Sequence, residues 1–291
     1  MEKRWKVQAE REVILKDFLR KEMGLTKRQI SQAKFRKEGI RVNGQRAKVN
    51  RLLNAGDEVD VLLEEEGNVS HIPLWKKSPR ILYEDGDLLI IDKPAGMVSH
   101  PAHGHYCDTA ANMAAAYLEG KGQKGVIRPV GRLDKDTSGI LVFAKNQAAA
   151  ARVTKQREKG ICEKEYLALV SGKMTKPSGS ICMPLRKVPG ELMRMEVCEK
   201  GGMTAVTHFQ VLEERDDASL LSVKIETGRT HQIRVHMAWM GHPLLGDRLY
   251  GNDDNVRERA ALHAWKLTLR QPFTGEKIQL ETEVPADMNL C

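Results

Sequence analysis

The spacing of apolar and polar residues predicts a helical segment at the start of the chain. In residues 12–24, four apolar side chains recur at helical spacing, and Gly24 is a natural helix end. Residues 25–39 predict a second helix, with Thr26 as its N-cap and Gly39 as its end. An Asn-Gly turn then joins two short extended pieces, and "AGDEVDVLL" alternates as a strand should.

From residue 81 onward the pattern changes and becomes rich in strands. Two apolar stretches around an acidic turn predict a hairpin, and further strands and a final hairpin are expected at 81–96, 139–146, 163–172, 204–214, 218–228 and 261–285. Helices are expected at 109–120, 147–160 and 229–241. Because hairpins recur, the sequence predicts an α+β fold with a mixed, largely antiparallel sheet and flanking helices.

These patterns divide the chain into two domains and a connection. Residues 1–66 form a small, basic α/β module. Residues 67–80 are polar and broken by Gly67, Pro73 and Pro79, which is typical of a linker. Residues 81–291 form the larger second domain.

Composition limits the classes of protein to consider. The longest apolar runs, such as "LLII" and "ILVFA", are far shorter than the roughly 18 residues that a membrane span needs. The start of the chain is charged and lacks an apolar signal core, so export is not expected. Five cysteines without a C-x-x-C pair suit free thiols in a reducing compartment, which predicts a cytoplasmic protein without a membrane partner.

The positive charge is concentrated at one end of the chain. Residues 1–53 hold 16 Lys and Arg against 6 Asp and Glu, whereas the remainder is close to neutral. Such asymmetry indicates a polyanion partner, most simply nucleic acid, although a solvated basic helix face has the same composition. The candidate RNA-docking residues are Lys27, Arg28, Lys34, Arg36, Lys37 and Arg41.

The stretch "GRLDKDTSGILVFAKN", residues 131–146, places acidic residues in a turn ahead of a strand. Residues two apart in an extended segment point the same way, so Arg132 and Asp134 can share one face. Asp136 is better explained as a turn former that bonds nearby backbone groups. Asp134 is therefore the candidate for chemistry, with a plain surface loop as the alternative.

A second cluster of polar residues lies in "ETGRTHQIRVHMAWMGHPLLGDRLYG", residues 226–251. Cationic and amide side chains at the expected start of a helix favour contact with phosphate or with a base. The residues of this kind are Arg229, His231, Gln232, Arg234 and His236. Histidines here and in "HPAHGHYC", residues 100–107, lack a second pair at ligand spacing, so no metal site is expected. Tyr166 is either core or an aromatic platform for an extruded base.

The basic module resembles a known RNA-binding motif. "VNGQ.AK...LL.AGD.V.V", within a stretch of about 50 residues, is similar to the motif first known from small-subunit ribosomal protein four. The resemblance implies that the module docks folded RNA through phosphates and shape.

The second domain resembles the RluA family of pseudouridine synthases. The likeness is carried by the two long motifs above together with "EKEYLALVSG" and "LHAWKL...P.TGE", in the family's order. It implies that Asp134 is the essential carboxylate, that Arg229 supplies a nearby cation, that Arg132 holds RNA while a uridine is flipped, and that Tyr166 stacks on the uracil. The chain departs from the family at Gly131, where histidine is usual, and in the loop "HPAHGHYCDT".

The resemblance implies conversion of uridine to pseudouridine, which needs no redox partner or group donor and therefore no cofactor. Asp134 would either attack the nucleotide covalently or abstract a ribose proton to give a glycal. Ribosomal RNA of the large subunit is the favoured substrate, transfer RNA is possible, and no obligate protein partner is evident. The alternatives are a non-catalytic RNA-binding factor for ribosome assembly and, more remotely, a metal-dependent hydrolase that uses the histidines of 100–107.

Overall fold

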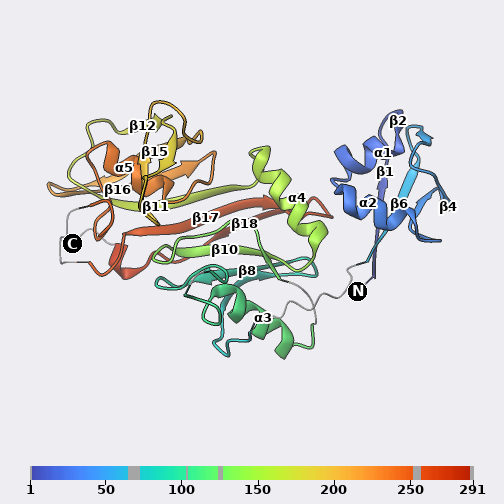
Figure 1. The fold of residues 1–291 in the computed structure, drawn as a ribbon, viewed down its shortest axis with the longest axis horizontal. Helices are drawn as coiled ribbons and strands as arrows, with labels where there is room; N and C mark the ends of the chain where they lie inside the picture. The colour runs from blue at the N-terminus through green and yellow to red at the C-terminus, as the bar shows by residue number, and fades with distance from the viewer. Residues whose placement is uncertain (1, 65–72, 103, 124–126, 252–256, 289–291) are drawn as a thin grey trace.

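The computed structural model describes residues 2–64, 73–102, 104–123, 127–251 and 257–288. Part of the predicted linker, residues 67–72, and His103 lie outside these described residues. A four-stranded sheet near the N-terminus lies at one end of a long ten-stranded sheet (Figure 1). No helix in the described ranges combines the length and apolar character needed to cross a bilayer.

The N-terminal module is a small sheet with helices beside it. The sheet has the order β1-β6-β3-β4, formed by β1 (Glu2–Gln8), β6 (Glu58–Glu64), β3 (Ile40–Val42) and β4 (Gln45–Arg46). A separate pair joins β2 (Val13–Ile14) to β5 (Leu52–Leu53). The helical elements are α1 (Leu15–Asp17), the π-helical η1 (Phe18–Glu22) and α2 (Lys27–Lys34).

The structure differs from the pattern-based expectation at both helices of the module. The first helix begins at Leu15, because Val13 and Ile14 pair with β5 as a strand. The second has Thr26 as N-cap, as predicted, where the Thr26 hydroxyl accepts a hydrogen bond from the Gln29 backbone. It ends at Lys34, one turn before the expected end at Gly39.

The large sheet is mixed and largely antiparallel, as the sequence predicted. Its order is β12-β15-β16-β11-β17-β10-β8-β7, with β18 paired to β17 and β9 paired to β10. Its strands are β7 (Arg80–Glu84), β8 (Leu88–Lys93), β9 (Arg128–Pro129), β10 (Ser138–Ala144), β11 (Glu163–Ser171), β12 (Ser178–Ile181), β15 (Thr207–Glu214), β16 (Ala218–Ile225), β17 (Leu262–Arg270) and β18 (Lys277–Glu281). Among the described residues, β10 and β17 form the parallel pair and the other neighbours are antiparallel.

The helices cover this sheet on both faces. They are α3 (Ala110–Gly120), α4 (Gln147–Glu158), α5 (Gln232–Trp239) and the short η2 (Ala286–Met288), and a small hairpin joins β13 (Leu185–Lys187) to β14 (Met195–Val197). Alternate side chains of β10 enter two different cores. Leu141 and Phe143 pack with residues of α3 and α5, whereas Ile140 and Val142 pack with residues of α4.

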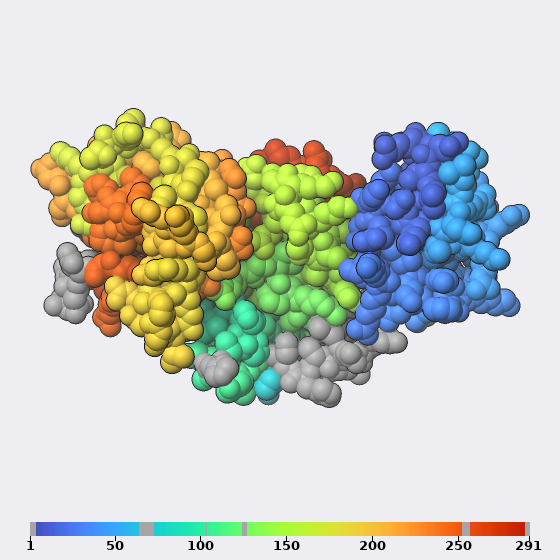
Figure 2. Space-filling model, turned by 45° about the horizontal axis from the view of Figure 1, so that its top comes forward, coloured from blue at the N-terminus to red at the C-terminus, as the bar shows by residue number. Residues whose placement is uncertain are grey.

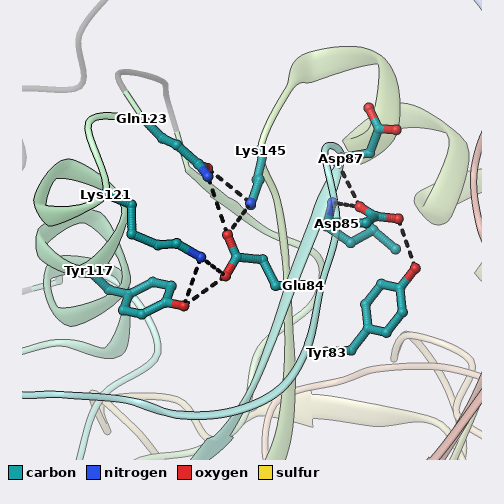
Figure 3. Close-up of polar contacts among 9 residues, drawn as sticks. Tyr83, Glu84, Asp85, Asp87, Tyr117, Lys121, Gln123 and Lys145 are labelled. Carbon is teal, nitrogen blue, oxygen red and sulfur yellow. Dashed lines mark hydrogen bonds and ion pairs between the residues drawn. The ribbon is translucent and has the colours of Figure 1, made fainter.

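A buried carboxylate fastens α3 to the edge of the sheet (Figure 3). Glu84 accepts hydrogen bonds from Tyr117 at 2.7 Å, Lys121 at 2.8 Å and Lys145 at 2.6 Å. Burial alone would raise the pKa of Glu84, but the hydrogen bonds from Lys121, Lys145 and Tyr117 outweigh it and lower the pKa to about 2. Glu84 is therefore ionised at neutral pH and ties three elements together.

The module is attached to the second domain through α4 (Figures 1 and 2). The Arg152 guanidinium lies 3.2 Å from the centre of the Trp5 ring and donates hydrogen bonds of 2.8 and 3.0 Å to the Met23 carbonyl. Phe273 meets Trp5 edge-on, with ring centres 5.3 Å apart, and Ala148 of α4 belongs to the apolar core of the module. Residues of both domains therefore share one packed boundary.

We expect Arg152→Ala to loosen the module without unfolding the second domain. The change removes a cation–π contact and leaves the Met23 carbonyl without its donors, a loss of about 2 to 4 kcal/mol. Hydrogen exchange should accelerate in β1 and η1 and stay unchanged in β10 and β11. Lys159→Ala, an exposed cation at the end of the same helix, is the matched control. Equal exchange in the two variants would contradict an attachment through Arg152.

Candidate active site

The predicted catalytic and substrate-binding residues line one cavity of about 580 Å³ in the second domain. Its walls are the loop before β10, the last turns of α4, the start of β11 and the turn between β16 and α5. Asp134, Tyr166 and Arg229 all line it, although 95 positions separate the first from the last. The predicted site residues that line the cavity are Arg132, Asp134, Tyr166, Arg229, His231, Gln232 and Arg234.

Backbone hydrogen bonds fix the loop that carries Asp134. On one side, Leu133 exchanges two hydrogen bonds with the Ser99 hydroxyl, of 2.7 and 3.0 Å. On the other side, Lys93 donates to the carbonyl of Lys135 at 3.2 Å, and Arg259 donates to the next carbonyl along the loop at 3.0 Å. The loop therefore holds a partly buried Asp134 carboxylate in place while that side chain remains at the cavity.

Gly139 sets how closely this loop approaches the middle of the sheet. A Cβ at this position would lie 2.3 Å from the carbonyl oxygen of Ala264 on β17, and the backbone has φ +105°. A side chain is excluded on both grounds. The parallel contact between β10 and β17, which begins beside this glycine, thus requires the "TSG" end of the motif.

Tyr166 forms part of the cavity wall from β11. It is buried at 6% exposure and belongs to the main core cluster. Burial raises the pKa of its hydroxyl, and the charge of Arg157 opposes this only in part. Tyr166 is therefore a neutral aromatic surface at neutral pH, which satisfies both the core and the platform interpretation of the sequence.

The start of α5 is held by side chains buried beneath it. His231 adopts a left-handed backbone, φ +54°, and its Nδ1 lies 2.8 Å from the Tyr250 hydroxyl. Gln232 accepts hydrogen bonds from the Thr227 hydroxyl and the Arg229 backbone, and donates to Val206 and Thr207. Gln232, predicted to bind RNA, has these amide partners within the protein, and it positions the turn that presents Arg229.

Arg234 forms a buried ion pair under the same turn. It makes two hydrogen bonds of 2.7 Å to Asp247, and the two side chains are 9% and 0% exposed. Asp247 also accepts from the backbone of Leu249 and Tyr250. Arg234 lines the cavity, but its guanidinium is committed to Asp247, which fixes Tyr250 and through it His231.

Arg229 lies at the cavity without forming the ion pair expected from the family resemblance. Its Nε donates to the Thr204 carbonyl at 2.9 Å, and no carboxylate of a described residue is within 4.0 Å of its guanidinium. Arg132 instead bonds the Thr230 hydroxyl. Both cations therefore line the cavity with Asp134, and neither forms an ion pair with its carboxylate in the described structure.

The predicted docking residues lie on α2, on the turn after it and, for Arg41, on β3. Lys27, Lys34 and Lys37 are exposed, whereas Arg41 forms an ion pair with Glu38. Between these cations stands Phe35, which is 77% exposed and lies 5.2 Å from the Lys34 ammonium by its ring centre. Sequence reasoning missed Phe35, although an aromatic residue inside a basic run is the signal for base stacking.

The histidines of residues 100–107 have separate surroundings. His100 lines the active-site cavity, and its Nδ1 is buried without a hydrogen-bond partner in the described structure. His105 pairs with Asp108 at 2.6 Å. Within the described residues, no three His, Cys, Asp or Glu side chains are grouped so as to hold a metal ion.

The family profile, the relatives and the solved structure that match this chain are all described as pseudouridine or pseudouridylate synthases. Residues 87–239 match the profile described as RNA pseudouridylate synthase. An uncharacterised RNA pseudouridine synthase of Bacillus subtilis is 42% identical over 87% of this chain and 84% of its own length. A ribosomal large subunit pseudouridine synthase D of Nitrosomonas europaea is 39% identical over 86% of this chain and 74% of its own. The solved structure of human RNA pseudouridylate synthase domain containing 1 aligns with a TM-score of 0.59 at 28% identity, covering 72% of this chain and 85% of that one.

A buried histidine behind the Asp134 loop makes stability depend on pH. Ser138 Oγ and His263 Nδ1 are 2.8 Å apart, and burial lowers the pKa of His263 to about 4, although Asp92 raises it in part. The unfolded chain has the ordinary pKa of about 6.5, so it binds more protons than the folded chain between pH 6.5 and 4. The free energy of unfolding should therefore fall as the pH falls through this window.

We expect His263→Gln to flatten this dependence by on the order of 1 to 3 kcal/mol. Denaturant unfolding at pH 7, 5.5 and 4.5 measures it for the wild type and the variant. Gln210→Asn at an exposed position of β15 removes no titrating group, so it is the control and should retain the wild-type slope. A His263→Gln protein with the full wild-type slope would place the titration elsewhere.

Proposed function

The chain belongs to the RNA pseudouridylate synthase family and is an RNA pseudouridine synthase, and we propose that Asp134 is its essential carboxylate and large-subunit ribosomal RNA its substrate. The observation that carries the assignment of Asp134 is its place at the shared cavity. The carboxylate stands on a loop fixed from both sides and faces the same space as Tyr166 and Arg229.

The reaction requires one ionised group beside the detached uracil. The bond from ribose C1′ to uracil N1 breaks, the uracil rotates, and a bond from C1′ to C5 forms. The hydrogen of C5 leaves as a proton and N1 gains one, so electrons and atoms balance without a redox partner. Asp134 serves either by attacking the nucleotide covalently or by removing a ribose proton to give a glycal.

The other cavity residues position the nucleotide. The uridine must leave the RNA stack to reach Asp134, and the ring of Tyr166 supplies a surface for the uracil. Arg132 and Arg229 stand at the cavity with guanidinium donors that suit the RNA backbone. The buried, unpartnered Nδ1 of His100 offers one further polar contact inside the cavity.

The N-terminal module docks the folded RNA. The chain's excess positive charge is concentrated there, and α2 presents exposed lysines around Phe35. Its likeness to the ribosomal-protein-four motif and the names of relatives from several bacteria as large-subunit synthases favour ribosomal RNA over transfer RNA. Both RNA classes can be compared directly in one assay.

Asp134→Asn should reduce turnover at least about a thousandfold and leave RNA affinity nearly unchanged, because the amide keeps the shape but loses the ionised oxygen. Tritium release from RNA labelled at uridine C5 measures the reaction directly. Transcripts of large-subunit ribosomal RNA and of transfer RNA are assayed separately, and release from the former alone is expected.

Asp136→Asn is the matched control, since it makes the same chemical change two residues away. It should retain most of the activity. An active, folded Asp134→Asn protein, or an equal loss in both variants, would rule out the special role of Asp134. Release from transfer RNA alone would overturn the proposed substrate and leave the catalytic assignment standing.

The triple change Lys27→Gln, Lys34→Gln and Lys37→Gln should weaken RNA binding and lower its dependence on salt. Each lost phosphate contact reduces the slope of log K against log salt by about 0.7 to 0.9, while kcat at saturating RNA stays the same. Filter binding at several salt concentrations measures the slope. The control changes three exposed cations to Gln: Lys173 and Lys176 between β11 and β12, and Arg215 between β15 and β16. Strands β12, β15 and β16 lie at the opposite end of the large sheet from the module (Figure 1). Equal slopes for both triple variants would refute docking by α2.

A further inference from the structure

Arg157, near the end of α4, reaches the active-site cavity between two glycines. A Cβ added at Gly131 would lie 2.9 Å from its Nη1, and one added at Gly228 would lie 2.9 Å from its Nη2. The guanidinium therefore rests against both loops of the site at positions where neither loop has a side chain. Gly131 is three residues before Asp134, and Gly228 is next to Arg229.

The guanidinium of Arg157 has no fixed partner. Within the described residues, it makes no ion pair with a carboxylate and no hydrogen bond, and the residue is exposed at the cavity rim. Its cationic neighbours differ in this respect. Arg234 is paired with Asp247, Lys164 donates to the Ile140 carbonyl, and Arg152 is bound to the N-terminal module.

The positive charge of Arg157 also acts on Tyr166, which lines the same cavity. Burial raises the pKa of Tyr166, and Arg157 is the cation that opposes this rise. Arg157 lines the same cavity as Asp134 and Tyr166, and no described residue pairs with its guanidinium there. An unpaired guanidinium at the mouth of a nucleotide-sized cavity fits a phosphate, because its planar donors match two phosphate oxygens at once.

We propose that Arg157 binds a backbone phosphate beside the flipped uridine, in a notch formed by Gly131 and Gly228. The proposal rests on the proposed function, since it places the target uridine at Asp134. A nucleotide that turns into this cavity leaves its flanking phosphates at the rim, where Arg157 stands. The two glycines allow the guanidinium to lie between the loops, so the notch and the cation form one phosphate site.

The first test removes the cation. In the Asp134→Asn background, Arg157→Ala should weaken RNA binding about tenfold and lower the salt slope by about 0.7 to 0.9, as loss of one phosphate contact requires. Arg157→Lys should restore the slope, because the charge returns, and recover only part of the affinity. Arg215→Ala, an exposed arginine at the far turn between β15 and β16, should leave both unchanged.

The second test fills the notch. Gly228→Ala places a methyl group against the flexible end of Arg157 and should displace it, whereas any side chain at Gly131 also strains a backbone with φ +80°. We expect Gly228→Ala to weaken binding several-fold in the presence of Arg157. In the Arg157→Ala protein the same change should cost almost nothing further, which is the signature of two positions that act through one contact.

The outcomes separate this proposal from the function on which it rests. An Arg157→Ala protein with the wild-type salt slope, or additive effects of the two changes, would overturn the phosphate site. Loss of turnover with an unchanged slope would also overturn it, since Arg157 would then only support the loops. If the wild type itself released no tritium from either RNA, the substrate assignment would fail, while the binding measurements on Asp134→Asn would still judge Arg157.

Discussion

Hydrogen bonds to the backbone on each side of Asp134 hold the loop that precedes β10, and the other residues of the cavity are arranged around it. Ser99 bonds Leu133, and Lys93 bonds the carbonyl of Lys135. Lys93 also donates to the carbonyls of Pro94 and Met97, so the three hydrogens of its ammonium match three acceptors. The Lys93 side chain is fully buried, and this burial lowers its pKa to about 7. These hydrogen bonds engage the backbone beside Asp134, and its side chain remains at the cavity.

Helix α4 connects this site to the N-terminal module. Arg152 packs against Trp5 of the module, and Arg157 touches the loops of the cavity. The two residues are five positions apart on one helix, or roughly 7 to 8 Å along its axis. Because the apolar side of α4 is packed onto β10, the helix cannot shift without disturbing the core. The module and the cavity therefore hold a defined spacing, which suits an enzyme that must select one uridine in a large folded RNA.

The sequence predicted the elements whose local signals agree with their packing. The strand that follows Asp134 and the helix capped by Thr109 lie where the pattern placed them, because both are bounded by turn or capping residues. Strand β1 was missed: Trp5 and Val7 alternate with charged residues, and the high charge of "MEKRWKVQ" obscured that period. The short strands β12, β13 and β14 were also missed, since their own residues give little local preference. The partner of β12 is the distant strand β15, whereas β13 and β14 pair with each other as a hairpin.

The candidate site shows the same division between local and tertiary information. The motif residues together with the family resemblance singled out Asp134, Tyr166 and Arg229, and the fold brings them to one cavity. Spacing could not reveal Arg157, because "KQREKG" is typical of a solvated helix end and its meaning depends on two glycines in other loops. Nor could it show that Gln232 is engaged by the protein itself.

Arginines at this site are distinguished by the partner that the fold supplies. Arg234 has a buried carboxylate, so its charge is balanced and it acts as a structural support. Arg152 has an aromatic ring and backbone carbonyls, so it joins two domains. Among the described residues, no carboxylate forms an ion pair with Arg157 or Arg229. Arg132 donates a hydrogen bond to the Thr230 hydroxyl. Arg132, Arg157 and Arg229 thus line the cavity beside Asp134, Glu158 and Glu226, and no described carboxylate forms an ion pair with any of the three. Their planar donors suit the phosphates of an RNA strand.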